Sequence, residues 1–198
     1  MRRIVFATGN EGKLREIRNI MADLPVEIVS MKEAGIEAEI EETGETFEEN
    51  AKIKAQAVAA HTDDIVLADD SGLEIDYLNK EPGVYSARYL GENTSYEIKN
   101  RTILDRLAGV EKEKRTARFV CAIAAVLPNK ETLVTRETIE GYIGERPAGE
   151  NGFGYDPIFY VEEYQCSTAE LSEEQKNAIS HRGKALRAMK KLLHEYGV

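Results

Sequence analysis

The chain of 198 residues is long enough for one sizeable domain or for two small lobes that share a core. Its hydrophobic content of 42% is ordinary for a globular protein, and its formal net charge of −10 argues against a general nucleic-acid binder, which would carry a basic face. A phosphate-bearing ligand must therefore meet local cations or a metal ion rather than a favourable overall field.

The two cysteines, Cys121 and Cys166, lie far apart without metal-ligand spacing, and Cys121 is expected to be a small buried hydrophobe. The basic start of the chain precedes an apolar run that is too short for a signal peptide, and no run approaches the length of a membrane span. We therefore expect a cytoplasmic enzyme or binding protein.

Residues 3–7 predict a buried first strand, and residues 8–13 predict the turn that leaves it. Apolar residues then recur at helical spacing and the helix ends before Pro25. A turn between a strand and a helix can bind an anion, because free backbone N–H groups and the helix dipole favour negative charge there, and Lys13 adds a positive charge. Such turns are also common without a ligand, and the Gly-Lys-Ser/Thr ending of a Walker loop is missing.

A second short strand is predicted at residues 26–29, followed by a glutamate-rich stretch over residues 37–49. Most of these glutamates are expected to form a solvated face, although a local excess of carboxylates also suits Mg²⁺. The sequence from Thr46 to Glu49 has the form of a capping box, which predicts a helix that runs to about His61.

Within that helix Asn50 and Lys54 are four residues apart and share one face. That face points either into a cleft or to an exposed surface.

The most informative stretch is residues 65–73, in which a short apolar run stops at Asp69 and Asp70 and is followed by Ser71 and Gly72. Aspartate is a poor strand former, and a buried carboxylate is costly without a partner. Two aspartates at the end of a core strand therefore call for a cation, a ligand or many hydrogen-bond donors. The alternative is a turn in which both aspartates face water.

Residues 73–78 alternate like a half-buried strand, and residues 94–97 predict a second capping box that opens a helix running to Ala108. Residues 117–127 and 132–142 predict two long strands that form an antiparallel hairpin. Strand–helix units early in the chain and a hairpin late predict an α/β fold in three layers, built on one long twisted mixed sheet.

Three glycines surround Phe153, an aromatic residue that does not look like part of a core. Glycine permits close approach of a ligand to the backbone, and a phenyl face can stack on a base. A β-bulge or a tight loop is the alternative reading.

Residues 172–175 predict a cap for a short helix that carries Lys176, and Ser180 is a good N-cap for the last helix. His181 and Arg182 then fall in the first turn of that helix, where a cation opposes the helix dipole. A position that breaks a local rule is more often functional than accidental.

Taken together, six stretches resemble the inosine triphosphate pyrophosphatase family over nearly the whole chain, in the order and spacing of that family. They are Thr8-Gly9-Asn10 with Lys13, residues 42–51, residues 68–73, residues 82–89, residues 152–159 and Ser180-His181-Arg182-Gly183. Residues 164–167 depart from the pattern in what is expected to be a peripheral loop.

The resemblance implies hydrolysis of ITP, dITP and XTP to the nucleoside monophosphate and pyrophosphate, which clears deaminated purines from the nucleotide pool. It implies Mg²⁺ as cofactor, a homodimer in the cytoplasm, and no nucleic-acid or membrane partner. The implied architecture is a single domain over residues 1–198, in which an elongated mixed sheet with flanking helices forms two lobes around a nucleotide cleft, with no independent linker. The fold of the Maf proteins is related.

The resemblance also implies roles for individual residues. Asp70 resembles the catalytic proton acceptor and a metal ligand, and Glu42 resembles a second metal ligand. The implied contacts to the phosphates are Thr8, Gly9, Asn10, Glu11, Gly12, Lys13, Lys54 and Ser71. The implied nucleotide contacts, mainly on the side of the base, are Phe153, Gly154, Tyr155, Asp156, Lys176, His181 and Arg182.

Two other functions are compatible with parts of the pattern. One is a pyrophosphatase for pyrimidine or modified nucleotides, as in the Maf-like proteins, which the segment Ser180-His181-Arg182 disfavours. The other is a nucleotide sensor that binds without hydrolysis, for which a cluster of carboxylates beside the phosphates would have little use.

Overall fold

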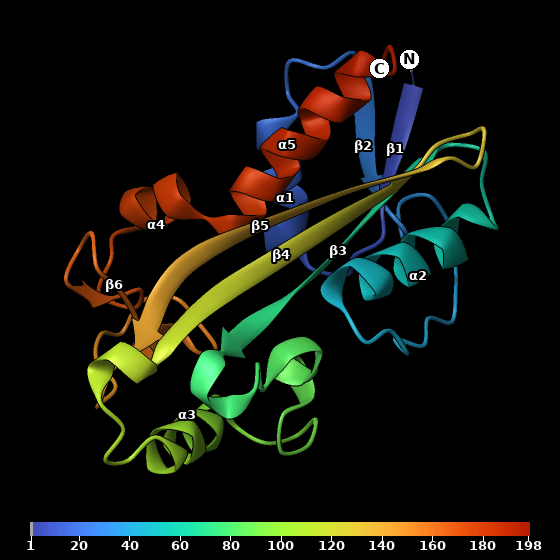
Figure 1. Cartoon of the computed structure of the whole chain (residues 1–198). Coiled ribbons are helices and arrows are strands. Elements are labelled where there is room, and N and C mark those ends of the chain that lie inside the picture. Colours follow the sequence, from blue (N-terminus) through green and yellow to red (C-terminus); the bar gives the residue numbers. More distant parts are fainter. Residues whose placement is uncertain (1) are drawn as a thin grey trace. The chain divides into compact units, whose positions relative to one another are not determined.

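The computed structural model describes residues 2–198 and contains a seven-stranded sheet with helices beside it (Figure 1). The strands lie in the order β2-β1-β3-β4-β5-β6-β7. Strand β1 is parallel to both of its neighbours, whereas β6 is antiparallel to β5 and β7. The predicted mixed sheet with flanking helices is therefore confirmed.

The strands are β1 (Arg2–Phe6), β2 (Val26–Ser30), β3 (Ile65–Ile75), β4 (Thr116–Val126), β5 (Thr132–Ile143), β6 (Phe159–Val161) and β7 (Cys166–Ser167). The α-helices are α1 (Glu11–Ile20), α2 (Phe47–Ala59), α3 (Tyr96–Arg106), α4 (Glu173–Ile179) and α5 (His181–Glu195). Short 3₁₀ helices are η1 (Asp76–Leu78), η2 (Gly83–Arg88), η3 (Lys112–Lys114) and η4 (Asp156–Ile158). Among the described residues, no helix is long and apolar enough to cross a membrane.

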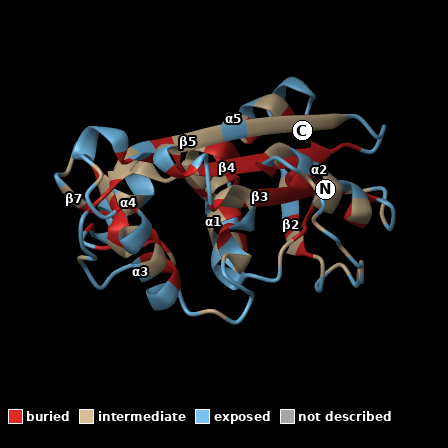
Figure 2. Ribbon diagram, turned by 60° about the horizontal axis from the view of Figure 1, so that its bottom comes forward, coloured by how far each residue is buried: buried red, intermediate tan, exposed pale blue. Residues whose placement is uncertain are grey.

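The chain forms two compact units, and each is assembled from separate segments. The first unit comprises residues 1–70, 121–137 and 181–198, and the second comprises residues 71–120 and 138–180. Each has an apolar core of its own, coloured red in Figure 2. In the first unit Phe6 and Leu67 pack with residues of α1 and α5; in the second Leu73 packs with Ile103 of α3 and with Phe159. The single domain over residues 1–198 stays a prediction.

The prediction for the aspartate stretch is wrong in one respect. Asp69 and Asp70 do not end a strand, because β3 continues without a break from Ile65 to Ile75. Strand β1 ends at Phe6, which pairs with Leu67, so the two aspartates lie just beyond the end of that neighbour. Tertiary contacts override the low strand propensity of aspartate, because both carboxylates have cationic partners from elsewhere in the chain.

Helix α2 begins as predicted. The Thr46 side chain accepts a hydrogen bond from the backbone N–H of Glu49, and the Glu49 side chain accepts one from the backbone N–H of Thr46. This capping box satisfies N–H groups that have no partner within the helix. It fixes the start of the helix that carries Asn50 and Lys54.

Two other predictions need correction. Helix α3 is capped by Ser95, whose side chain accepts from the Ile98 N–H, rather than by Thr94, whose hydroxyl donates to the Leu90 carbonyl. The helix therefore starts one residue later than the predicted box. Strands β6 and β7 were not predicted, because strands of three and two residues are too short to show a period of alternation.

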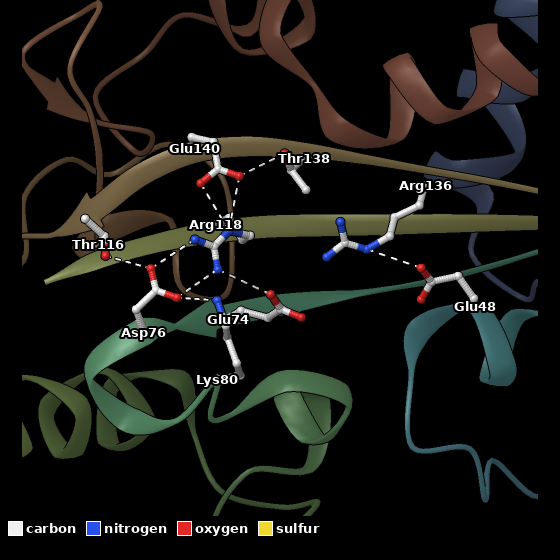
Figure 3. A network of polar contacts seen from close by, with 9 residues as sticks. All are labelled: Glu48, Glu74, Asp76, Lys80, Thr116, Arg118, Arg136, Thr138 and Glu140. Atoms are coloured by element: carbon white, nitrogen blue, oxygen red, sulfur yellow. Dashed lines mark hydrogen bonds and ion pairs between the residues drawn. The ribbon is translucent and has the colours of Figure 1, made fainter.

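Charged side chains link neighbouring strands on the surface of the sheet (Figure 3). In the second unit Arg118 of β4 donates to Glu140 of β5 at 3.1 Å and to Asp76, directly after β3, at 2.9 Å. In the first unit Arg136 of β5 forms an ion pair with Glu48 of α2 at 3.3 Å. The pair of Arg118 and Glu140 joins neighbouring strands, and such cross-strand pairs favour one register of the sheet over its alternatives.

Replacement of Thr46 by alanine removes the side-chain acceptor at the start of α2. We expect Thr46→Ala to lower the free energy of unfolding by about 1 kcal/mol, whereas Thr46→Ser, which keeps a hydroxyl, should stay within a few tenths. Urea denaturation followed by circular dichroism measures both. Equal stability of the wild-type and alanine proteins would show that the capping box does not stabilise α2.

Candidate functional site

Asp69 and Asp70 are adjacent in β3 but belong to different clusters. Successive side chains of a strand point to opposite faces of the sheet. Asp69 shares its face with Leu67, which packs in the core with α1 and α5, and Asp69 contacts side chains from both helices. Asp70 contacts Lys54 of α2. The first unit therefore places one charged cluster on each face of β3.

The Asp69 cluster contains two cations. The Lys13 ammonium lies 2.8 Å from Asp69 Oδ2, and Arg182 Nε donates to the same oxygen at 3.4 Å. The Arg182 guanidinium also reaches Glu16 of α1 at 3.3 Å. Burial would raise the pKa of Asp69, but the charges of Lys13 and Arg182 outweigh it and hold the pKa at about 2. Asp69 is therefore a permanently ionised anchor for both cations.

The Asp70 cluster is different. The Lys54 ammonium lies 2.7 Å from Glu42 Oε1 and 3.5 Å from Asp70 Oδ1. Asp70 Oδ2 is buried and has no hydrogen-bond partner among residues 2–198. Burial raises the pKa of Asp70 to about 6; Lys54 opposes this shift, and Glu42 adds to it. A carboxylate with this pKa is ionised near neutral pH and remains basic enough to accept a proton.

The turn between β1 and α1 is held by its own side chains. The Thr8 hydroxyl accepts from the Asn10 N–H at 3.1 Å, and Asn10 Oδ1 accepts from the Lys13 N–H at 3.1 Å. Asn10 is thus the N-cap of α1. The N–H groups of Glu11 and Gly12, in the first helical turn, have no acceptor within the helix. These donors are suited to an anion, and the Lys13 ammonium, which is paired with Asp69, belongs to the same helical turn.

In the second unit two of the residues predicted to contact the base, Phe153 and Asp156, lie around a third, Lys176. The Lys176 ammonium pairs with Asp156 Oδ2 at 2.5 Å and lies 5.4 Å from the ring centre of Phe153, a residue that is 74% exposed. The Phe153 N–H also donates to Asp156 at 2.8 Å. Glycine suits position 152, because φ is +78° there and a Cβ would lie 2.3 Å from Asp156 Oδ2.

A hollow of about 520 Å³ borders this group; it is lined by Asn151, Gly152, Leu171, Ser172, Glu173 and Lys176. Tyr155 lies away from it, buried in the core of the second unit, and its hydroxyl donates to the Ser86 carbonyl at 2.6 Å. Any contact of Tyr155 with a substrate would therefore come from its backbone. The substrate contacts predicted for Phe153, Gly154, Tyr155, Asp156 and Lys176 stay predictions.

Two residues were missed by the sequence analysis. Asp69 was noticed as half of an acidic pair but was given no role, although it joins Lys13 to Arg182. The period of two along a strand could have separated it from Asp70. Glu16 gave no signal, because a glutamate on an amphipathic helix is normally solvated; here it contacts Arg182.

No group of three or more histidine, cysteine or acidic side chains in residues 2–198 is arranged to hold a metal ion. Glu42 and Asp70 nevertheless meet around one ammonium group, and Asp70 has a buried oxygen without a partner. Two carboxylates suit an ion that takes few protein ligands, keeps several waters and binds substrate phosphates, as Mg²⁺ does.

A sequence model of the Ham1 family matches residues 4–192. The chain belongs to the Ham1 family. A relative named dITP/XTP pyrophosphatase from Bacillus licheniformis is 49% identical, and the match covers 98% of this chain and 100% of the relative. This confirms the resemblance found in the sequence.

Solved structures agree with this assignment. The Ham1 protein of Staphylococcus aureus has a TM-score of 0.91 at 44% identity, and that of Coxiella burnetii has a TM-score of 0.92 at 44% identity. Both comparisons cover 98% of this chain and 100% of the relative. The fold of the Ham1 family therefore extends over nearly the whole chain.

Replacement of Asp70 by asparagine should stabilise the protein in the presence of a chelator. The folded pKa of about 6 lies above the ordinary value of 3.8, so the native state binds more protons between these values and stability falls as pH rises through this window. Asp70→Asn removes that loss, so the free energy of unfolding should rise by roughly 3 kcal/mol at about pH 7.5, and this gain should disappear below about pH 4. Urea denaturation at the two pH values measures it.

Asp69→Asn is the matched control. Its carboxylate has a lowered pKa, so its ionised form contributes stability that is present at neutral pH. The control substitution should therefore destabilise the protein at about pH 7.5. Equal effects of the two substitutions would contradict the assignment of the aspartates to different environments.

Proposed function

We propose that this protein hydrolyses ITP, dITP and XTP to the nucleoside monophosphate and pyrophosphate, and so removes deaminated purines from the nucleotide pool. The observation that carries the proposal is the pair of adjacent aspartates with opposite environments, one an anchor for cations and the other a carboxylate suited to accept a proton. The relatives named dITP/XTP pyrophosphatase support the same assignment.

In this proposal the triphosphate binds to groups of the first unit. The N–H groups at the start of α1 and the Lys13 ammonium supply donors and positive charge for phosphate oxygens. Asp69 holds Lys13 in place while remaining ionised. Lys54 supplies a second ammonium, beside Asp70. Little covalent chemistry is required of the protein, because hydrolysis of a phosphoanhydride depends mainly on positioning and neutralisation of charge.

Asp70 accepts the proton of the attacking water. The water oxygen forms a bond to one of the two phosphorus atoms that flank the α–β bridging oxygen, and the bond from that phosphorus to the bridging oxygen breaks. General-base catalysis of this kind contributes on the order of 10²–10⁴-fold to the rate. Asp69 is unsuited to this task because its pKa of about 2 makes it a weak base.

We assign Mg²⁺ as the cofactor, held by Asp70 and Glu42. The hard oxygens of both side chains fit this ion, and the unpartnered Oδ2 of Asp70 offers a ligand atom. When bound, the ion neutralises charge on the phosphates and lowers the pKa of water.

Selection of the base requires donors directed at the 6-oxo group of hypoxanthine or xanthine. An adenine amino group in that place would leave the donors unpaired, at a cost of about 1–3 kcal/mol each. Arg182 and the N–H groups at the start of α5 are our candidates for these donors. In the second unit, the exposed ring of Phe153 near Lys176 is by itself suited to stacking. The location in the cytoplasm and the homodimer implied by the sequence stay predictions.

Purified protein with Mg²⁺ and dITP should release pyrophosphate, as measured by a coupled assay that distinguishes it from orthophosphate. A panel of purine and pyrimidine triphosphates should show a preference for ITP, dITP and XTP. Orthophosphate as the first product would refute the position of cleavage, and a preference for pyrimidine or modified nucleotides would refute the substrate class. Asp70→Asn is the control that should abolish turnover while retaining affinity for the nucleotide.

Arg182→Ala tests whether the Arg182 side chain contributes to selection of the base. Loss of a donor to the 6-oxo group should reduce kcat/KM for dITP more than for dATP, so that the ratio between them narrows by about tenfold. Kinetics with both nucleotides measure the ratio. A uniform loss would instead assign Arg182 to the phosphate side, together with its partner Asp69.

A further inference from the structure

Among the described residues of α2, Asn50 is the one buried polar side chain. It lies one helical turn before Lys54, whose ammonium contacts both carboxylates of the Asp70 cluster. Asn50 Oδ1 accepts a hydrogen bond from the Gly44 N–H at 2.8 Å. Gly44 follows Glu42 by two residues, so this bond attaches the loop that carries Glu42 to the helix that carries Lys54.

The close approach of the loop to Asn50 depends on glycine. A Cβ at position 44 would lie 2.7 Å from Asn50 Oδ1 and 2.9 Å from the Asn50 backbone nitrogen. Real Cβ atoms do not approach a backbone nitrogen so closely, and the nitrogen belongs to the first turn of a capped helix that cannot easily move. The contact between Gly44 and Asn50 therefore depends on the glycine of the loop and on the fixed start of α2.

The other end of the Asn50 amide faces Asp70. Asn50 Nδ2 is buried and has no hydrogen-bond acceptor among residues 2–198, and Asp70 Oδ2 is buried and has no donor there. The Asn50 side chain lies beside Asp70 and lowers the pKa of that carboxyl as a hydrogen-bond donor does, although in the described part of the chain neither Asn50 Nδ2 nor Asp70 Oδ2 has a hydrogen bond of normal geometry. A small shift of either side chain would pair an unsatisfied donor with an unsatisfied acceptor, which is favourable because unpaired buried polar groups are costly.

We propose that Asn50 is a positioning residue of the hydrolytic site, which holds the Glu42 loop through Gly44 and orients the Asp70 carboxylate with its second N–H group. The proposal rests on the proposed function and extends it to a residue that does not itself touch the substrate. Residues that orient ligand or base carboxylates in this way change metal affinity or activity by about 10–100-fold when they are replaced.

Two substitutions separate the attachment of the Glu42 loop from the orientation of the Asp70 carboxylate. Asn50→Asp keeps an oxygen that can accept from the Gly44 N–H but loses the amide donor and adds a negative charge. Asn50→Leu has nearly the same shape, loses both the acceptor and the donor, and adds no charge. Val58→Ala is the matched control, because Val58 is a fully buried residue of the same helix that contacts neither carboxylate in the interactions described above.

The first readout is hydrogen exchange of the Gly44 amide in the protein without nucleotide, measured by NMR. We expect protection in the wild type, in Asn50→Asp and in Val58→Ala, and faster exchange in Asn50→Leu. This measurement is independent of activity, so it tests the attachment of the loop even if the proposed function fails. Equal protection in wild type and Asn50→Leu would overturn that attachment.

The second readout is pyrophosphate release from dITP at saturating Mg²⁺. Both Asn50 variants should lose about 10–100-fold in kcat with KM for dITP nearly unchanged, whereas Val58→Ala should keep its kcat despite a lower thermal midpoint. Wild-type turnover in Asn50→Leu would overturn the orienting role, since any loss in Asn50→Asp would then come from its added charge. A wild-type protein that releases no pyrophosphate would refute the proposed function instead.

Discussion

The structure of this site depends on the burial of two adjacent carboxylates in one continuous strand. A buried ionised carboxylate without a partner is strongly unfavourable, and two neighbours of like charge make the cost larger. The pleat of β3 solves this by directing Asp69 and Asp70 to opposite faces, where each finds cations from a different part of the chain. Charge thereby ties the helices α1, α2 and α5 to a single strand, and α1 and α5 also pack against it through apolar residues.

The two faces of β3 compensate the two negative charges to different degrees, so the pKa values of Asp69 and Asp70 shift in opposite directions. Asp69 has an ammonium at 2.8 Å and a guanidinium beside it, so its charged form is fully stabilised. Asp70 shares one ammonium with Glu42 and keeps an oxygen without a donor, so burial prevails and its pKa rises to about 6. Environments that push the pKa values of neighbouring acids apart are typical of sites that divide the roles of anchor and base.

In the second unit, too, a buried carboxylate holds neighbouring groups in fixed positions. The Asp156 carboxylate accepts from Lys176, from the Phe153 N–H and from the Thr168 hydroxyl at 2.8 Å. It thereby fixes the ammonium near the exposed phenyl ring of Phe153. A flat ring on the loop before η4 and an oriented cation on α4 are suited to contact with a base, whereas the Tyr155 side chain packs in the core.

The sequence alone determined the family, the principal strands and the caps of α2 and α4, because these depend on residues close together in the chain. A capping box is complete within four positions, and a buried strand such as β3 is predicted by its run of apolar residues. The sequence also marked Asp70, Lys54 and Glu42 through the order of the family's motifs, although their roles remain a proposal.

Only the tertiary structure decided which cation serves which carboxylate. Arg182 and Asp69 are separated by 113 positions, and their contact depends on how α5 packs beside β3 rather than on any local spacing. The continuation of β3 through both aspartates also depends on tertiary contacts. The low strand propensity of aspartate opposes it, and long-range ion pairs outweigh that propensity. The burial of Tyr155 and of the Asn50 side chain likewise follows from packing between residues far apart in the chain, which no local sequence pattern displays.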